Sequence, residues 1–82
     1  MTKFILVECI DRDIFKKGVY YSWEEAHEDM VKRVALTVDE EITCDENGYA
    51  FGDNWGIQKW DAWIDSPNNH TFDDYDYAIL EV

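Results

Sequence analysis

A single stretch of this 82-residue chain has the period of an amphipathic helix, and strand-like segments lie on both sides of it. The helix is predicted over residues 23–38, where apolar side chains recur every three or four positions. These side chains are Trp23, Ala26, Met30, Val34, Ala35 and Val38. Ser22 and Glu25 form the capping box that marks its start, in which the Ser22 hydroxyl accepts from the Glu25 amide and the Glu25 side chain returns to the Ser22 amide.

The segment before the helix favours strands. Residues 3–10 are rich in β-formers and apolar on both alternating faces, as expected of a strand inside a sheet, and we predict that they form the first and most buried strand. Residues 14–21, with Gly18 in the middle, fit either a short second strand or an extended lead-in to the helix.

The segment after the helix begins with a loop over residues 39–48, followed by a short strand at 49–51. Residues 55–65 are predicted as one longer strand, ended by the Ser66-Pro67 turn, and residues 75–82 as the last strand. On the longer strand the better core candidates share one face. They are Gln58, Trp60, Ala62 and Ile64.

These elements predict an α+β fold in a single domain, residues 1–82. One amphipathic helix can cover one face of a sheet, so the economical arrangement packs it on a small, mostly antiparallel sheet of three to four strands.

Charge is distributed unevenly along the chain. Residues 39–82 carry twelve acids and one base, Lys59, and so hold eleven of the twelve excess negative charges. Concentrating charge in this way costs stability through self-repulsion and attracts basic surfaces. It also disfavours direct binding to nucleic acid or to an anionic membrane, because both carry charge of the same sign.

No catalytic or cofactor motif is present. The segment Asp45-Glu46-Asn47-Gly48 is similar to the middle of a calcium loop, but Thr43 and Asn54 would occupy its two strongest ligand positions. His27 has no histidine four residues later, so the zinc-protease helix pattern fails. We therefore predict a non-enzymatic protein without cofactor or metal.

Location is predicted from the amino terminus and the cysteines. Residues 1–10 have one cation before an apolar run that Glu8 interrupts, which does not match a signal peptide or a membrane span. Cys9 and Cys44 are far apart in the sequence and lack a CxxC pattern, which fits buried, reduced thiols. Together these features predict a soluble, cytoplasmic protein.

The layout resembles that of small uncharacterised acidic proteins of Gram-positive bacteria and their phages. The resemblance is carried by the segments KFILVE, YYSWEEAHEDM, NWGIQKWDAWID and DYAILEV, which span most of the chain. It implies no activity by itself. By size and charge alone, highly acidic single domains of phage origin resemble the anti-CRISPR inhibitors of host defence nucleases, which often mimic nucleic acid.

The leading functional hypothesis is a nucleic-acid mimic, in which carboxylates replace phosphates and aromatic side chains anchor a basic partner such as a Cas effector or another nuclease. The predicted partner-binding residues are Asp53, Trp55, Asp61, Trp63, Asp65, Asp73, Asp74, Tyr75 and Asp76. The alternative is a bacterial or mobile-element domain with a structural, homo-oligomeric role, whose charge serves solubility. Both a monomer and a homodimer are compatible with the sequence.

Overall fold

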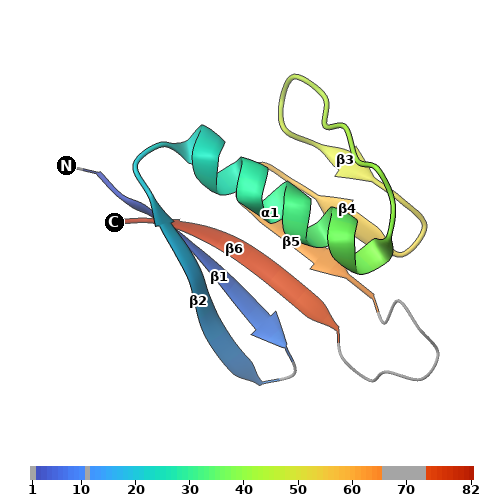
Figure 1. Ribbon diagram of the computed structural model, residues 1–82, viewed down its shortest axis with the longest axis horizontal. Helices are drawn as coiled ribbons and strands as arrows, with labels where there is room; N and C mark the ends of the chain where they lie inside the picture. Colours follow the sequence, from blue (N-terminus) through green and yellow to red (C-terminus); the bar gives the residue numbers. More distant parts are fainter. Residues whose placement is uncertain (1, 11, 66–73) are drawn as a thin grey trace.

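The computed structural model describes residues 2–10, 12–65 and 74–82, and Figure 1 shows the helix lying across a twisted sheet. The elements are β1 (Phe4–Ile10), β2 (Asp13–Tyr20), α1 (Trp23–Val38), β3 (Ala50–Phe51), β4 (Trp55–Ile57), β5 (Asp61–Ile64) and β6 (Tyr75–Glu81). Its Cα atoms extend over 43 × 29 × 15 Å. The shortest dimension fits one helix layer on one sheet layer, since packed layers are about 10 Å apart.

The sheet has six strands in the order β2-β1-β6-β5-β4-β3, and every neighbouring pair is antiparallel. The α+β class is as predicted, but the predicted sheet of three to four strands is wrong. The segment before the helix, which fitted either a short strand or an extended lead-in, is an eight-residue strand, β2. The long strand predicted over residues 55–65 is two strands, β4 and β5.

The division of residues 55–65 comes from a tight turn between β4 and β5. The Gln58 amide donates to the Asp61 carbonyl at 2.7 Å, so the chain reverses direction there. Ala62 and Ile64 are buried as predicted, but Gln58 and Trp60 lie in the turn and are exposed. The prediction from alternating side chains was wrong for Gln58 and Trp60, because the turn interrupts the single strand that it assumed.

The helix begins where the capping box predicts. The Ser22 hydroxyl accepts from the Glu25 amide at 3.2 Å, as predicted. The Glu25 side chain was predicted to return to the Ser22 amide, but its carboxylate accepts from the Ser22 hydroxyl at 3.0 Å. At the other end Asp39 adopts a left-handed conformation, with φ of 57°, and its amide bonds to the Ala35 carbonyl. This end has no basic residue in its last turn.

The core lies between α1 and the sheet. The helix contributes Met30 and Val34, which are fully buried against Leu6 of β1 and against Ile57 and Ile64 of the β4–β5 hairpin. β1 has a neighbour on each side, as predicted for an interior strand. It is not the most buried strand, because all three residues of β4 are buried whereas β1 alternates.

The loop between α1 and β3 contacts the helix through the side chain of His27. This histidine is buried, and its Nε2 lies 2.9 Å from the carbonyl oxygen of Gly48. Gly48 has φ of 88°, and the Asp45 carboxylate accepts from the Asn47 and Tyr49 amides to close the turn. The Asp45 carboxylate, which resembles a calcium ligand in the sequence, therefore stabilises its own loop through these hydrogen bonds.

Candidate interaction surfaces

Acidic residues from three separate segments meet at one end of the sheet. Trp55 of β4 is paired with Ile64 of β5, which is paired with Tyr75 of β6, so these residues form one row across the sheet. Three of the predicted partner-binding acids lie just beyond this row and are exposed: Asp53, Asp65 and Asp74. We call these three residues the acidic end.

The carboxyl-terminal end of α1 adds to the negative potential of the acidic end. The Trp55 indole donates from Nε1 to the Glu40 carboxylate at 3.2 Å, which brings the residues after the helix close to the start of β4. A helix carboxyl terminus carries a partial negative charge, and no basic residue in the last turn of α1 offsets it. Asp65 is held in place because its amide donates to the Asn54 carbonyl at 2.8 Å.

Two of the predicted partner-binding aromatics belong to the core. Trp55 is 5% exposed, and Tyr75 packs against the same buried cluster. Both face α1, because they share a face with the buried residue Ile64. Asp73 lies outside the described residues.

The remaining predicted residues, Asp61, Trp63 and Asp76, lie on the side of the sheet that α1 does not cover. Asp61 and Trp63 are two residues apart on β5, and Asp76 is directly opposite Trp63 on β6. Within the part of the chain that the structure describes, no element covers this side (Figure 1). We call it the open face, made by Lys3, Ile5, Val7, Cys9, Ile14, Lys16, Val19, Phe51, Gly56, Asp61, Trp63, Asp76, Ala78, Leu80 and Val82.

The open face is apolar although it is accessible. Exposed large hydrophobic side chains gather on it. They are Ile14, Val19, Phe51, Leu80 and Val82. Ile5, Val7 and Trp63 on the same face are half-buried. The indole of Trp63 lies across β4, where a Cβ on Gly56 would come within 2.7 Å of the ring. Contiguous exposed apolar patches on soluble domains mark interaction sites, ligand-binding grooves or aggregation liabilities.

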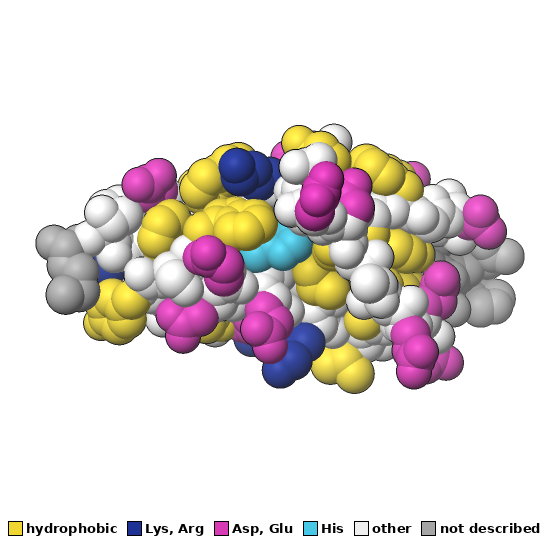
Figure 2. Space-filling model, turned by 90° about the horizontal axis from the view of Figure 1, so that it is seen from above, with side chains coloured by type: hydrophobic (Ala, Val, Ile, Leu, Met, Phe, Trp, Pro, Cys, Tyr) yellow, Lys and Arg dark blue, Asp and Glu magenta, His cyan; other side chains and the backbone are white. Residues whose placement is uncertain are grey.

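Charge on the open face is balanced, unlike charge on the whole chain. It carries two cations, Lys3 and Lys16, and two anions, Asp61 and Asp76, in a chain of net charge −12. The excess acids lie elsewhere, and Figure 2 shows acidic side chains scattered along the length of the molecule.

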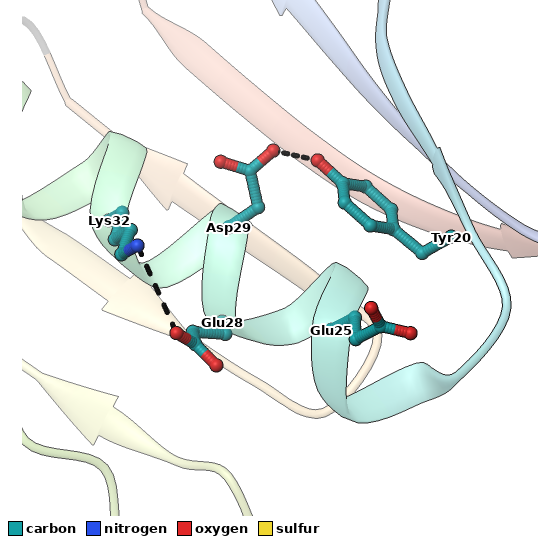
Figure 3. A pocket seen from close by; sticks show the side chains of 5 residues that line it. All are labelled: Tyr20, Glu25, Glu28, Asp29 and Lys32. Carbon is teal, nitrogen blue, oxygen red and sulfur yellow. Dashed lines mark hydrogen bonds and ion pairs between the residues drawn. The ribbon is translucent and has the colours of Figure 1, made fainter.

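The helix side carries a polar hollow of about 340 Å³ between β2 and α1 (Figure 3). Its lining groups already bond to one another or to neighbours. Tyr20 donates to the Asp29 carboxylate, which also pairs with Arg33 at 3.3 Å, and Lys32 lies 3.9 Å from Glu28. Burial, and then the hydrogen bond to Asp29, raise the pKa of Tyr20. These pairings explain the hollow as a packed junction between strand and helix.

A second hollow, also of about 340 Å³, lies where the start of α1, the residue 45–49 loop and the β4–β5 turn meet. Trp23 is one of the lining residues, and its indole donates from Nε1 to the Lys59 carbonyl at 2.7 Å, while the Lys59 ammonium lies 5.9 Å from the indole centroid. Trp60 contacts Trp23 edge-on and stacks on Phe4, so the exposed Trp60 belongs to an aromatic cluster at this end of the molecule.

No group of three or more His, Cys, Asp or Glu side chains among the described residues is arranged to hold a metal ion. In the same residues, no helix is long and apolar enough to cross a membrane. Comparisons with protein-family models, with curated proteins and with solved structures find no match to this chain.

Sequence reasoning identified acids of both surfaces but missed the open face as a unit. The signal was present in residues 3–10, whose apolar side chains alternate on both sides of a strand. With one amphipathic helix in the chain, one of those two sides had no partner. The sequence alone does not give the strand register, and this register places Ile5, Leu80 and Trp63 on the same side of the sheet.

Proposed function

We propose that the protein is a non-enzymatic binding protein whose acidic end engages a basic, nucleic-acid-handling protein. The observation that carries this proposal is the convergence of Asp53, Asp65 and Asp74 from three segments beside the carboxyl terminus of α1. Exposed carboxylates in such a cluster attract a cationic groove and speed association, and they need little desolvation at the rim of an interface.

The proposed partner belongs to the class that binds phosphate backbones, because closely spaced carboxylates present similar charge. Within this class, a Cas effector or another defence nuclease is the specific form of the proposal, and it rests on the resemblance in size and charge to anti-CRISPR proteins. Trp63 and Asp76 lie next to the acidic end on the open face, and the proposed contact with the partner does not depend on them. Trp55 and Tyr75 support the surface from the core.

The site of action in this proposal is the cytoplasm, where such nucleases act. The reduced state proposed for Cys9 and Cys44 fits that compartment. Both thiols are half-buried, Cys9 on the open face and Cys44 against the core.

The test compares two variants of equal charge. In the first, Asp53, Asp65 and Asp74 are changed to Asn, which neutralises the acidic end. In the second, the exposed acids Glu41, Glu46 and Glu81 are changed to Gln, which removes the same charge elsewhere. Binding to a panel of purified Cas effectors and other defence nucleases is measured over a range of salt concentrations, with inhibition of cleavage as a second readout.

We expect the Asn variant to bind at least about tenfold more weakly and with a flatter salt dependence, and the Gln variant to keep most of the affinity. An oligonucleotide should compete with the native protein for the partner. Equal loss in both variants would show that net charge, and not the acidic end, governs binding. Absence of binding across the panel would reject the nuclease form of the proposal.

A further inference from the structure

The open face of the sheet combines apolar surface with balanced charge, and two of its charges, on Lys16 and Asp61, are placed so that the face complements itself. We propose that it binds the open face of a second copy of this chain, forming a symmetric dimer. This inference is independent of the proposed function, because the acidic end lies outside the contact.

The central row of the open face carries the argument. Lys16 of β2 is opposite Val7 of β1, Val7 is opposite Ala78 of β6, and Ala78 is opposite Asp61 of β5. A cation and an anion therefore stand at the two ends of one row, with small apolar side chains between them. With strands about 4.8 Å apart, the two end residues lie about 14 Å from each other, too far to pair within one chain.

A two-fold axis parallel to the strands, placed between β1 and β6, reverses this row in the second copy. Lys16 then faces Asp61 of the other copy, and Asp61 faces Lys16, while Val7 faces Ala78. Stacked sheets are about 10 Å apart, a gap that a lysine and an aspartate side chain span together. Aligned packing of two sheets is also the common arrangement in β-sandwiches.

The same axis also sets the contacts of the neighbouring rows. In one of them Ile14, Cys9, Asp76 and Trp63 follow one another across the sheet, so the rotation places Ile14 over Trp63 and Cys9 over Asp76. On the other side of the central row, Ile5 is opposite Leu80, and the rotation brings these two apolar side chains together. Each large apolar group near the centre of the face meets another apolar group, as an isologous contact requires.

Charge favours a second copy over other occupants. A strongly basic partner would meet Lys3 and Lys16, and a strongly acidic one would meet Asp61 and Asp76, whereas a copy of this face pairs Lys16 with Asp61 at two symmetric positions. Repulsion between two chains of charge −12 opposes dimerisation, but the face itself contributes none of that excess. The molecule is 43 × 29 Å across its broad side, enough for the roughly 800 Å² per partner of a standard interface.

The geometry of the dimer has a consequence for the acidic end. Rotation about an axis parallel to the strands keeps the direction along the strands unchanged, so both acidic ends point the same way. The dimer would present Asp53, Asp65 and Asp74 twice on one side. A partner with two basic sites, or a dimeric partner, would then be bound with increased avidity.

The test is a charge exchange followed by sedimentation equilibrium over protein concentrations up to about 1 mM. The native protein should dimerise. Lys16→Glu and Asp61→Lys should each raise the dimer dissociation constant about 100-fold, roughly tenfold for each of the two symmetric pairs.

An equimolar mixture of the two variants should form a heterodimer. In it the two introduced side chains, which are opposite in sign, face each other, and the native Asp61 of one variant faces the native Lys16 of the other. A monomeric native protein, or a mixture that stays monomeric, would overturn the proposal.

A matched pair of apolar positions provides the control. Leu80→Glu places a charge on the open face, and Leu36→Glu places one on the outer side of α1, where the leucine is 82% exposed. Circular dichroism checks that both variants are folded. We expect loss of the dimer in the first and an unchanged dimer in the second, and dimerisation of the folded Leu80→Glu variant would contradict the assignment. The Asp53, Asp65 and Asp74 variant should still dimerise, so failure of partner binding and failure of dimerisation are separable.

Discussion

The two faces of the sheet are built from the same strands and differ little in apolar character, yet one is covered and the other is not. On the covered face Leu6, Ile57 and Ile64 are fully buried beneath α1. On the open face Ile5 and Val7 come from the same strand as Leu6, but they are only half-buried, and Leu80 is 48% exposed. Strand alternation alone does not distinguish these positions.

The difference shows that residue pattern sets which side chains share a face, while the number of covering elements decides which face becomes core. The one helix among the described residues covers one face of the sheet. A second apolar face then either remains accessible, at a cost in solubility, or is covered by another molecule. The balanced charge of the open face agrees with the second outcome.

The largest expected effect comes from removing the same side chain on each face. Leu6→Ala leaves a cavity beneath α1 and should lower the free energy of unfolding by about 3 kcal/mol. Leu80→Ala removes surface that water already reaches, and should cost about 1 kcal/mol or less in dilute solution. Urea denaturation monitored by circular dichroism measures both.

Varying the protein concentration provides a further test of these two substitutions. If the open face is buried in a dimer, the cost of Leu80→Ala should grow as the protein is concentrated, whereas that of Leu6→Ala should stay nearly constant. Equal losses at all concentrations would mean that the two faces do not differ in burial.

A smaller effect is expected from a buried carboxylate on the covered face. Glu8 is 8% exposed, and its carboxylate accepts from the Tyr77 hydroxyl at 2.6 Å and pairs with Lys17 at 3.2 Å. The irregularity in β2 opposite Leu6 and Val7 allows Lys17 to reach Glu8. Tyr77→Phe should lower the free energy of unfolding by about 1–3 kcal/mol, because it removes a bond to a buried carboxylate. Tyr75→Phe is the control and should cost less.

The same tyrosine predicts a dependence on pH. Burial, and then the hydrogen bond to Glu8, raise the pKa of Tyr77 above its ordinary value near 10. The unfolded chain then loses this proton more readily than the folded protein does. The contribution of Tyr77 to stability is therefore complete below about pH 10 and declines as the pH rises further. Denaturation midpoints above about pH 10 should fall less steeply for Tyr77→Phe than for the native protein, and parallel declines would show that Tyr77 is not protected.

The helix could be predicted from sequence because its signals are local. Ser22 and Glu25 lie three residues apart, and the apolar stripe repeats within the segment itself. The number of strands could not be predicted in the same way. Trp60 continues an alternating pattern, and only the hydrogen bond between Gln58 and Asp61 shows that the chain turns there.

The candidate surfaces depend on pairings between distant segments. Asp65 and Asp74 are separated in the sequence, and their proximity follows from the pairing of Ile64 with Tyr75. The row that joins Lys16 to Asp61 requires three strand pairings and one irregularity in register. Composition predicted an acidic region, for which partner binding is a proposal, whereas register revealed the balanced charge of the open face.

The smallest expected effect concerns the start of α1, the helix that covers one face of the sheet. Ser22→Ala removes the hydroxyl that accepts from the Glu25 amide, and should cost about 1 kcal/mol, a typical value for loss of a hydroxyl cap. Ser22→Thr keeps the hydroxyl and should restore most of the loss. The helix would fray at Trp23, whose indole donates to the Lys59 carbonyl, so hydrogen exchange should increase first in the opening turn of α1 and at the β4–β5 turn. Exchange on the open face should stay unchanged, because the strands there do not depend on the cap. An unchanged denaturation midpoint in Ser22→Ala would show that covering of the sheet begins later in the helix.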